Sequence, residues 1–232
     1  MNAIEARDLE KSFTGGDGGR VDVLAGVGLE VGAGELVAIV GASGAGKSTL
    51  LHLLGALDRP TRGTVTLGGE PLEGRSDEQL AALRNRRVGF VFQFHHLLRE
   101  FSAEENVMMP MRIAGWDDGK ARARAREMLS RVGLADRMSH RPAELSGGEQ
   151  QRTAVARALV MDPAVVLADE PSGNLDHLNA ERLHDEFVRV VRELGVAMVV
   201  VTHNRSLASR ADRVLLLEDG RLGGPGAQEA LA

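Results

Sequence analysis

The fold is decided by residues 41–48, which read Gly41-Ala42-Ser43-Gly44-Ala45-Gly46-Lys47-Ser48. This stretch fits the pattern G-x-x-x-x-G-K-[ST], in which backbone amides surround phosphate groups. A β-type run, Glu35–Val40, precedes it, and an apolar helix is predicted over Lys47–Leu57. The amino end of that helix would direct its partial positive charge at the phosphates. The sequence therefore predicts a phosphate-binding loop; the alternative is a glycine-rich turn before a core helix.

The residue types in this loop predict its contacts. Lys47 is expected to reach the β- and γ-phosphates, and the Ser48 hydroxyl is expected to bind Mg²⁺. Among the 28 cationic residues, lysine occurs only at positions 11, 47 and 120, and a compact ammonium fits a tight loop better than a guanidinium. The nucleotide contacts expected here are Gly41, Ser43, Gly44, Ala45, Gly46, Lys47, Ser48 and Thr49.

The composition excludes several classes of protein. The 232 residues, 43% of them hydrophobic, suffice for one domain with a subdomain. A net charge of −5 and an aromatic content of 3% argue against a nucleic-acid partner. Cysteine is absent, so neither disulfides nor thiolate metal sites are expected. No signal-peptide core or membrane-length apolar run is visible, so a soluble cytoplasmic protein is expected.

Short apolar runs alternate with longer amphipathic ones, which is typical of an α/β fold. Strands are predicted at Ile4–Asp8, Val21–Leu24, Val27–Val31, Glu35–Val40, Thr64–Leu67, Val88–Phe92, Ala164–Ala168, Ala197–Thr202 and Arg213–Glu218. Helices are predicted at Lys47–Leu57, Asp77–Arg87, Glu104–Ile113, Asp118–Val132, Glu149–Met161 and Asn179–Leu194. The first strands have an antiparallel pattern, with a turn at 15–19. Because 94–145 contains helical patterns alone, a helical subdomain is expected there, inserted between core segments 1–93 and 146–232.

Two strand ends carry candidate catalytic groups. The buried strand ending at Ala168 is followed by Asp169 and Glu170. Since ligands bind beyond the carboxyl ends of parallel strands, Asp169 is expected to hold Mg²⁺ and Glu170 to polarise an attacking water. His203 follows another strand and is expected to donate to the γ-phosphate. The alternatives are a solvated strand end and a capping histidine.

The stretch Leu145-Ser146-Gly147-Gly148-Glu149 lies between the phosphate loop and the acidic pair. In this order, the motifs resemble those of ABC-type ATPases. The resemblance implies a P-loop NTPase fold with a mixed-sheet core, an antiparallel β subdomain and the helical insertion. It also implies ATP and Mg²⁺ as cofactors, with hydrolysis by Lys47, Gln93, Glu170 and His203.

The family resemblance assigns further roles to individual residues. Gln93 would sense the γ-phosphate and join Ser48 and Asp169 around Mg²⁺. Phe13 would stack on adenine, although a core residue at a strand end is nearly as good an interpretation. Ser146, Gly147, Gly148, Glu149 and Asp176 would contact ATP held by a second copy, in a head-to-tail homodimer.

The stretch Phe94-His95-His96-Leu97-Leu98 is similar to the lipoprotein-releasing, LolD-like group of these ATPases. That similarity implies a peripheral subunit on the cytoplasmic face of the bacterial inner membrane. A LolC/LolE-type permease pair would dock near 94–112. The alternatives are a MacB-type efflux ATPase and an FtsE-like cell-division ATPase that is not coupled to transport. Arg99 and Glu104, at the presumed partner surface, depart from the pattern of the group.

Two other groups of residues in the helical region have open interpretations. Met108, Met109 and Met111 would line the docking groove or belong to the core. The basic residues Lys120, Arg122, Arg124 and Arg126 do not form one helical stripe, so a solvated helix is expected rather than a nucleic-acid surface.

Overall fold

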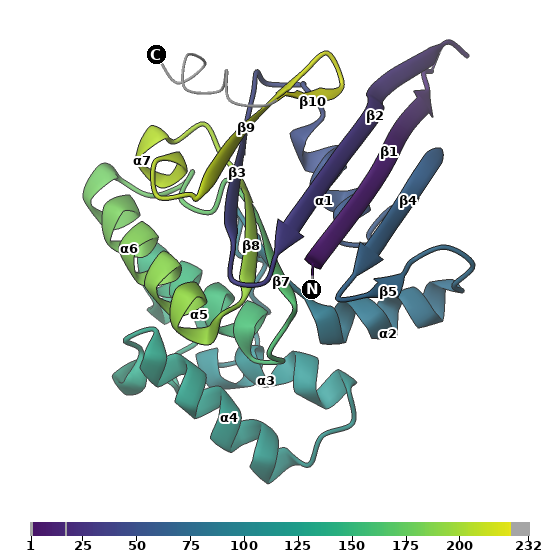
Figure 1. Cartoon of the computed structure of the whole chain (residues 1–232). Helices are drawn as coiled ribbons and strands as arrows, with labels where there is room; N and C mark the ends of the chain where they lie inside the picture. Colours follow the sequence, from purple (N-terminus) through teal and green to yellow (C-terminus); the bar gives the residue numbers. More distant parts are fainter. Residues whose placement is uncertain (1, 17, 224–232) are drawn as a thin grey trace.

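The computed structural model describes residues 2–16 and 18–223 (Figure 1). Asp17, in the predicted turn at 15–19, and the last residues of the predicted core segment 146–232 lie outside the described residues. The turn itself is confirmed, because the Gly15 amide donates to the Gly19 carbonyl at 2.7 Å.

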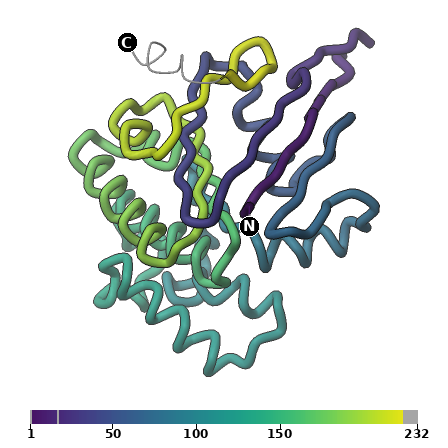
Figure 2. Tube along the Cα trace, viewed as in Figure 1, coloured from purple at the N-terminus to yellow at the C-terminus, as the bar shows by residue number. Residues whose placement is uncertain are grey.

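The centre of the described structure is a mixed sheet with the strand order β10-β9-β3-β8-β7-β6. Its strands are β3 (Leu36–Val40), β6 (Val88–Phe92), β7 (Val165–Asp169), β8 (Ala197–Val201), β9 (Arg213–Glu218) and β10 (Arg221–Gly223). β3 is parallel to β8 and β9, and β7 is parallel to β6 and β8, whereas β10 is antiparallel to β9. Strands far apart in the chain thus lie side by side and end at one edge of the sheet (Figure 2).

Both faces of this sheet are covered. Every residue of β3 and β8 is buried, which explains their continuous apolar sequences. Helices cover the faces: α1 (Lys47–Leu54), α5 (Gly147–Leu159) and α6 (His177–Leu194). Leu36, Ala38 and Val40 of β3 belong to the hydrophobic cluster that includes α5 and α6, and Val37 and Ile39 to the cluster that includes α1. Successive residues of β3 therefore pack into hydrophobic clusters on opposite faces of the sheet.

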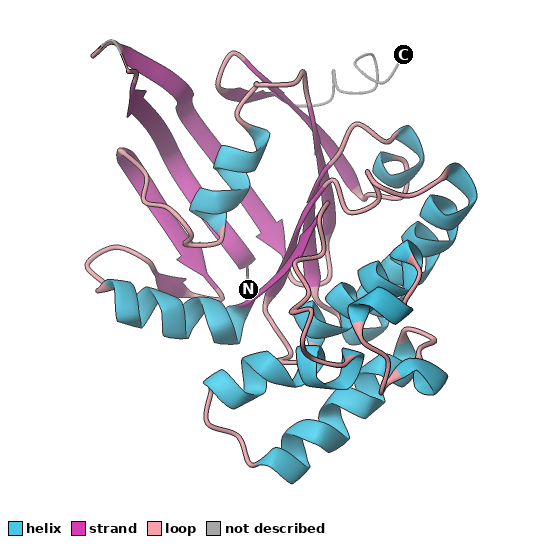
Figure 3. Ribbon diagram, turned by 180° about the vertical axis from the view of Figure 1, so that it is seen from behind, coloured by secondary structure: helices cyan, strands magenta, loops and turns pink. Residues whose placement is uncertain are grey.

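The second sheet is antiparallel, with the order β2-β1-β4-β5. Its strands, and the helix that follows them, are β1 (Asn2–Thr14), β2 (Arg20–Gly32), β4 (Arg62–Leu67), β5 (Glu70–Pro71) and α2 (Asp77–Arg87). Helix α1 lies between the two sheets and contacts β4, β7 and β8 (Figure 3). The predicted fold class, with a mixed sheet and an antiparallel sheet, is confirmed.

Some predicted boundaries are wrong. The two strands predicted over Val21–Val31 are one strand, β2, which passes Gly26 with φ +84° and shifts register against β1 there. The helix predicted to reach Leu57 ends at Leu54, because Gly55 caps it and Ala56 turns the chain with a left-handed φ of +56°. The short elements β5, β10 and α7 (Arg205–Ala208) were not predicted, since so few residues show no periodicity.

In the chain, a helical region lies between β6 and β7, and it forms the lower part of the molecule in Figure 1. It contains α3 (Ala103–Ile113), α4 (Asp118–Arg131) and the 3₁₀ turns η1 (Ala135–Arg137) and η2 (Pro142–Glu144), and α3 and α4 pack on α5. Met108 and Met111 are fully buried in the core, so the groove-lining interpretation is wrong for these two, while Met109 is half-buried. Among the described residues, no helix has both the length and the apolar character needed to cross a bilayer.

The basic residues of α4 are not simply solvated. The carboxylate of Glu104, a buried side chain on α3, forms ion pairs with Arg122 and Arg126, which lie one helical turn apart. Arg124, by contrast, pairs with Glu127 and Asp162. The Glu104 charge is therefore compensated within the helical region, which explains how an acidic side chain is accommodated at this buried position.

Candidate active site

Many of the residues predicted to bind phosphate and Mg²⁺ meet at the carboxyl edge of the mixed sheet. In register, Asp169 at the end of β7 lies beside Phe92 of β6 and Val201 of β8, and Val201 lies beside Ile39 of β3. A cavity of about 580 Å³ opens at this edge. It is lined by Val23, Ser43, Gly44, Gly46, Lys47, Ser48, Thr49, Phe92, Gln93, Phe94, His96, Asp169 and Glu170.

Glycine is required at two positions of the phosphate loop. Gly41 has φ +155°, and a Cβ there would lie 2.3 Å from the Leu217 carbonyl oxygen. Gly46 has φ +96°, and its Cβ would lie 2.9 Å from Val23 Cγ1. These close approaches explain why glycine occupies both positions, where the loop passes β9 and β2.

The loop presents positive charge to the cavity. Helix α1 begins at Lys47 with no side-chain cap and no acidic residue in its first turn, so the positive end of its dipole is not neutralised locally. The Lys47 ammonium donates to the carbonyl oxygens of Gly41 and Ala42, at 2.8 and 2.9 Å. The lysine thus lies across the loop, positioned for an anion that enters it.

Glu170 is held by the loop that follows β8. It has φ +45°, in the left-handed region, and its amide donates to the Val201 carbonyl at 2.9 Å. Its carboxylate accepts hydrogen bonds from the His203 amide at 3.0 Å and from the Thr202 hydroxyl at 3.1 Å, and it lies 2.7 Å from His203 Nδ1. Because the His203 side chain is 78% exposed and that of Glu170 only 18%, the imidazole covers the carboxylate on its solvent side.

Gln93 is tied to the loop after Glu170. Its Nε2 donates to Asn174 Oδ1 at 3.1 Å, and Asn174 Nδ2 donates back to the Gln93 carbonyl at 2.9 Å. A Cβ at Gly173 would lie 2.8 Å from Gln93 Nε2, so a side chain at this position would require Gln93 to shift. The Gln93 Oε1 atom remains available to a cation, together with the Ser48 hydroxyl and the Asp169 carboxylate.

The signature residues lie elsewhere. Ser146 caps α5 in a capping box with Glu149, whose carboxylate accepts from the Ser146 amide and hydroxyl, both at 2.8 Å, and from Arg137 at 2.9 Å. The Ser146 amide and hydroxyl, and then Arg137, lower the pKa of Glu149 to about 2. Asp176 caps α6. Among the described residues, the cavity lining includes none of Ser146, Gly147, Gly148, Glu149 and Asp176.

The structure excludes one interpretation of Phe13 and places His96 at the cavity. Phe13 is 44% exposed on β1, so the interpretation as a core residue is wrong; it is not among the described residues that line the cavity. Lys11 Nζ lies 5.0 Å from the centre of its ring. His96 lies in the segment expected to face the permease, but it lines the cavity. The centre of its ring lies 5.6 Å from the centre of the Phe92 ring, in an edge-to-face arrangement.

Several contributing residues were missed from the sequence. Val23 and Phe92 line the cavity, Thr202 holds Glu170, and Asn174 holds Gln93. Of these residues, only Thr202 and Asn174 could have been suggested by the sequence, because both are polar and lie within two residues of a predicted site residue. His95 is half-buried; burial, then the neighbouring charges of His96 and Arg157, lowers its pKa.

Comparison with known proteins identifies the family of this chain. The family model described as ABC transporter matches residues 24–173, from the middle of β2 to the loop after Glu170. The chain belongs to the ABC transporter family. It is therefore an ATP-hydrolysing enzyme with a P-loop.

Similar ABC proteins extend over nearly the whole chain. The LolD protein of Geobacter metallireducens, a lipoprotein-releasing system ATP-binding protein, is 56% identical over 219 residues, 94% of this chain and 97% of that protein. The LolD proteins of Bordetella pertussis (56%, 95% of each chain) and Porphyromonas gingivalis (52%, 94% of this chain and 98% of that protein) are similar too. Two dimeric structures of the ATP-binding cassette MJ0796, one bound to ADP and Pi, match with TM-scores of 0.85, at 35% and 36% identity, covering 94% of this chain and 96% of those.

Proposed function

We propose that this chain is the ATPase subunit of an ABC complex that releases lipoproteins from the bacterial inner membrane. The observation that carries the proposal is 56% identity, over 94–95% of the chain, to proteins named for that function. This similarity favours lipoprotein release over the efflux and cell-division alternatives.

The chemistry follows from the groups around the cavity. Lys47 and the amino end of α1 would bind the β- and γ-phosphates of ATP. Glu170 would accept a proton from the water whose oxygen attacks the γ-phosphorus, while the bond to the β-phosphate oxygen breaks and ADP leaves. His203, which lies 2.7 Å from Glu170, would orient that carboxylate and donate to the γ-phosphate.

The donor set of the cavity fits Mg²⁺. Ser48, Gln93 and Asp169 supply hydroxyl, amide and carboxylate oxygens at one cavity, and Mg²⁺ prefers oxygen ligands. When bound, the ion neutralises charge that develops on the phosphates. The three side chains would hold the ion, and Asp169, at the end of a fully paired strand, would be the most rigid of them.

A second copy of the chain would complete the site. The signature Ser146–Glu149 opens α5 with a helix amino terminus, which suits an anion, but it lies outside the cavity of its own chain. We therefore infer a head-to-tail homodimer in which each signature and each Asp176 loop faces the ATP of the partner. The dimeric state of the MJ0796 cassettes supports this arrangement.

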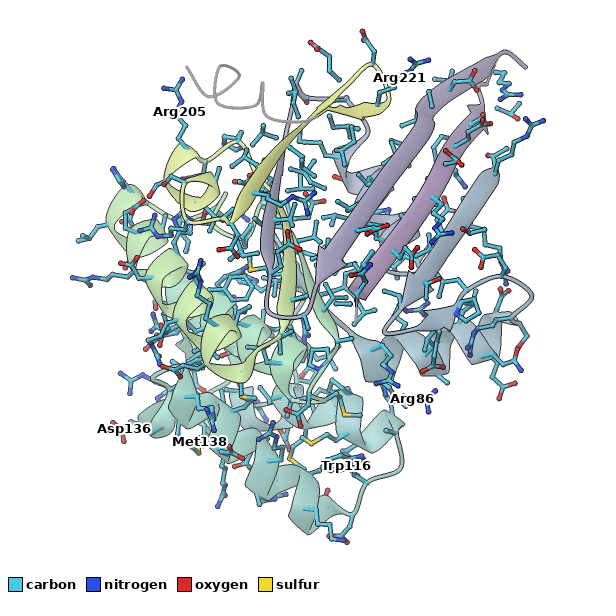
Figure 4. The ribbon with its side chains drawn as sticks, viewed as in Figure 1. Arg86, Trp116, Asp136, Met138, Arg205 and Arg221 are labelled. Atoms are coloured by element: carbon cyan, nitrogen blue, oxygen red, sulfur yellow. The ribbon has the colours of Figure 1, made fainter. Side chains whose placement is uncertain are left out.

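A groove beside the helical region suits the membrane partner. It encloses about 440 Å³ between α2, β6, α3 and α5, with Phe90, Pro110, Ile113 and Met161 in its lining. Ile113 is 70% exposed. Arg86 on α2 and Trp116 just after α3, both labelled in Figure 4, mark the elements on its two sides. We infer that short helices of a LolC/LolE-type permease pair dock here and along 94–112, on the cytoplasmic face, so that 94–145 moves as a subdomain.

Complementation would test the proposal. The chain, with its cognate permease pair, is expressed in a bacterium depleted of its own lipoprotein-releasing ATPase, and lipoprotein transfer to a soluble carrier is measured. Release is expected with the wild type and not with Glu170→Gln, while both variants co-purify with the permease. Normal ATP hydrolysis in the complex with no lipoprotein released would contradict the proposed substrate and leave the ATPase assignment intact.

A further inference from the structure

A fully buried histidine lies behind the catalytic loops. His184, on α6, has no solvent exposure, and its Nε2 lies 2.7 Å from the hydroxyl oxygen of Ser172, itself only 6% exposed. Ser172 follows Glu170 by two residues. A buried imidazole costs free energy unless a hydrogen bond compensates it, so this pair fixes where the Ser172 loop meets α6.

The same turn of α6 also contacts the loop that follows His203. The Glu181 carboxylate accepts from the Ser206 hydroxyl at 2.7 Å and from Arg210 at 2.9 Å. Its other oxygen lies 3.6 Å from His184 Nδ1, and neither of these two atoms has a hydrogen-bond partner among the described residues. Two residues three positions apart on one helix therefore hold the segments that follow Glu170 and His203.

The loop that follows Glu170 needs contacts that hold its conformation. Glu170 has φ +45°, a conformation that costs about 1 kcal/mol or more and persists when its surroundings hold it. Two turn hydrogen bonds stabilise the loop, from the Gly173 amide to the Glu170 carbonyl at 3.0 Å and from the Leu175 amide to the Ser172 carbonyl at 3.0 Å. Ser172 is the position at which this turn is joined to the helix layer.

A nucleophilic role for Ser172 does not fit. Serine, histidine and a carboxylate follow one another here as in a hydrolase triad, but both Ser172 and His184 are buried and no substrate reaches the hydroxyl. The 3.6 Å separation of His184 and Glu181 is also too long for the hydrogen bond that orients a catalytic imidazole. Burial lowers the pKa of His184. This direction agrees with a neutral ring that forms one hydrogen bond with Ser172.

We propose that His184 is a positioning residue for ATP hydrolysis: through Ser172 it fixes the loop that orients the Glu170 carboxylate against His203. The inference rests on the proposed role of Glu170 as the base. It assigns to α6 a function beyond packing, because its His184–Glu181 turn sets the relative position of the two catalytic loops.

The test is a double-mutant cycle in the purified full-length chain, read as kcat and KM for ATP. His184→Leu and Ser172→Ala are each expected to lower kcat about two- to tenfold, the range of one hydrogen bond, with KM changed less than twofold. The double variant is expected to match the more affected single variant, and His184→Gln, which keeps a polar group near Nε2, to recover most of kcat. If His184→Leu does not fold, the kcat values of Ser172→Ala and His184→Gln test the inference instead.

The control is Phe187→Leu, a buried packing change one turn further along α6. It is expected to lower the melting temperature while preserving kcat. An unchanged kcat in Ser172→Ala, effects that multiply in the double variant, or an equal loss in Phe187→Leu would each overturn the inference. Retained hydrolysis by Glu170→Gln would remove the proposed base as well, whereas an inactive Glu170→Gln beside a normal Ser172→Ala would remove this inference alone.

Discussion

Gln93 and Asn174 exchange two hydrogen bonds across the carboxyl edge of the sheet, although 81 residues separate them in the chain. One bond joins the two side-chain amides and the other joins the Asn174 amide to the Gln93 backbone. The loops that follow β6 and β7 are therefore coupled, and the same glutamine is a candidate ligand of Mg²⁺. A movement of Gln93 that preserves these hydrogen bonds would also move the loop that ends at Asp176.

The coupling of this pair can be measured in the nucleotide-free protein. Gln93→Ala and Asn174→Ala should each lower the free energy of unfolding, and the double variant should lose less than their sum by about 0.5–1 kcal/mol, the contribution of exposed hydrogen bonds. Denaturant unfolding monitored by circular dichroism gives the four values. Asn179→Ala, whose side chain contacts Asp176 instead, serves as the control and should be additive with Gln93→Ala. Additivity of the Gln93 and Asn174 changes would show that the loops are not coupled.

Lys47→Ala should abolish the stabilisation of the protein by ATP. The ammonium is the cation placed across the phosphate loop, so its loss removes the charge opposite the β- and γ-phosphates. Wild-type protein should gain about 2.7 kcal/mol when ATP reaches a hundred times its dissociation constant. Thermal unfolding with and without Mg·ATP measures the difference, and Lys120→Ala, an exposed lysine on α4, should behave as wild type. An ATP-dependent shift retained by Lys47→Ala would contradict the assignment of the loop.

The central strands and the long helices were predictable because their periodicity reflects burial. Asp77–Arg87 and Val88–Phe92 were predicted at their observed bounds. Acidic residues in the first turn and basic residues in the last turn mark the helix, and a continuous apolar run marks the strand. The end of α1 was not predicted, because the chain turns at Ala56 with a left-handed φ of +56°, a conformation that alanine does not signal in the sequence. Likewise, the pairing of β1 with β2 through register shifts is set by the sheet and leaves no local mark.

Part of the site could also be predicted. The phosphate loop, Gln93, Asp169 and Glu170 line one cavity, as parallel-strand geometry requires. The tie between Asn174 and Gln93 and the covering of Glu170 by His203 could not be inferred, because each joins side chains from loops whose conformation the sequence pattern does not encode. The roles of these residues in hydrolysis stay predictions.

Glu170→Gln should nearly stop turnover while ATP binding remains. The amide cannot accept the proton of the attacking water, and loss of a general base typically lowers the rate about 10²–10⁴-fold. With hydrolysis blocked, ATP should hold two copies together, and size-exclusion chromatography with light scattering should detect the dimer. Glu193→Gln, an exposed change on α6 paired with Arg189, should leave turnover unchanged. Wild-type turnover in Glu170→Gln would refute the assigned base, and monomers alone in excess Mg·ATP would refute the shared site.

The Glu149 carboxylate should make the stability of the chain depend on acid pH. Hydrogen bonds from Ser146, then from Arg137, lower its pKa from 4.5 to about 2 in the folded protein. Since the folded value lies below the unfolded one, the ionised carboxylate stabilises the protein above pH 4.5, and this contribution is lost as the pH falls from 4.5 toward 2.

The comparison of wild type with Glu149→Gln isolates that charge, because glutamine preserves the shape of the capping box. At pH 7 the variant should be less stable by about 1–2 kcal/mol, and the difference should shrink steadily below pH 4.5. Urea unfolding of both proteins between pH 7 and pH 3 gives the profile. Arg137→Gln should reduce the difference at neutral pH, because among the described residues Arg137 is the one cation paired with this carboxylate. A difference that stays constant down to pH 3 would mean that the Glu149 charge does not stabilise the start of α5.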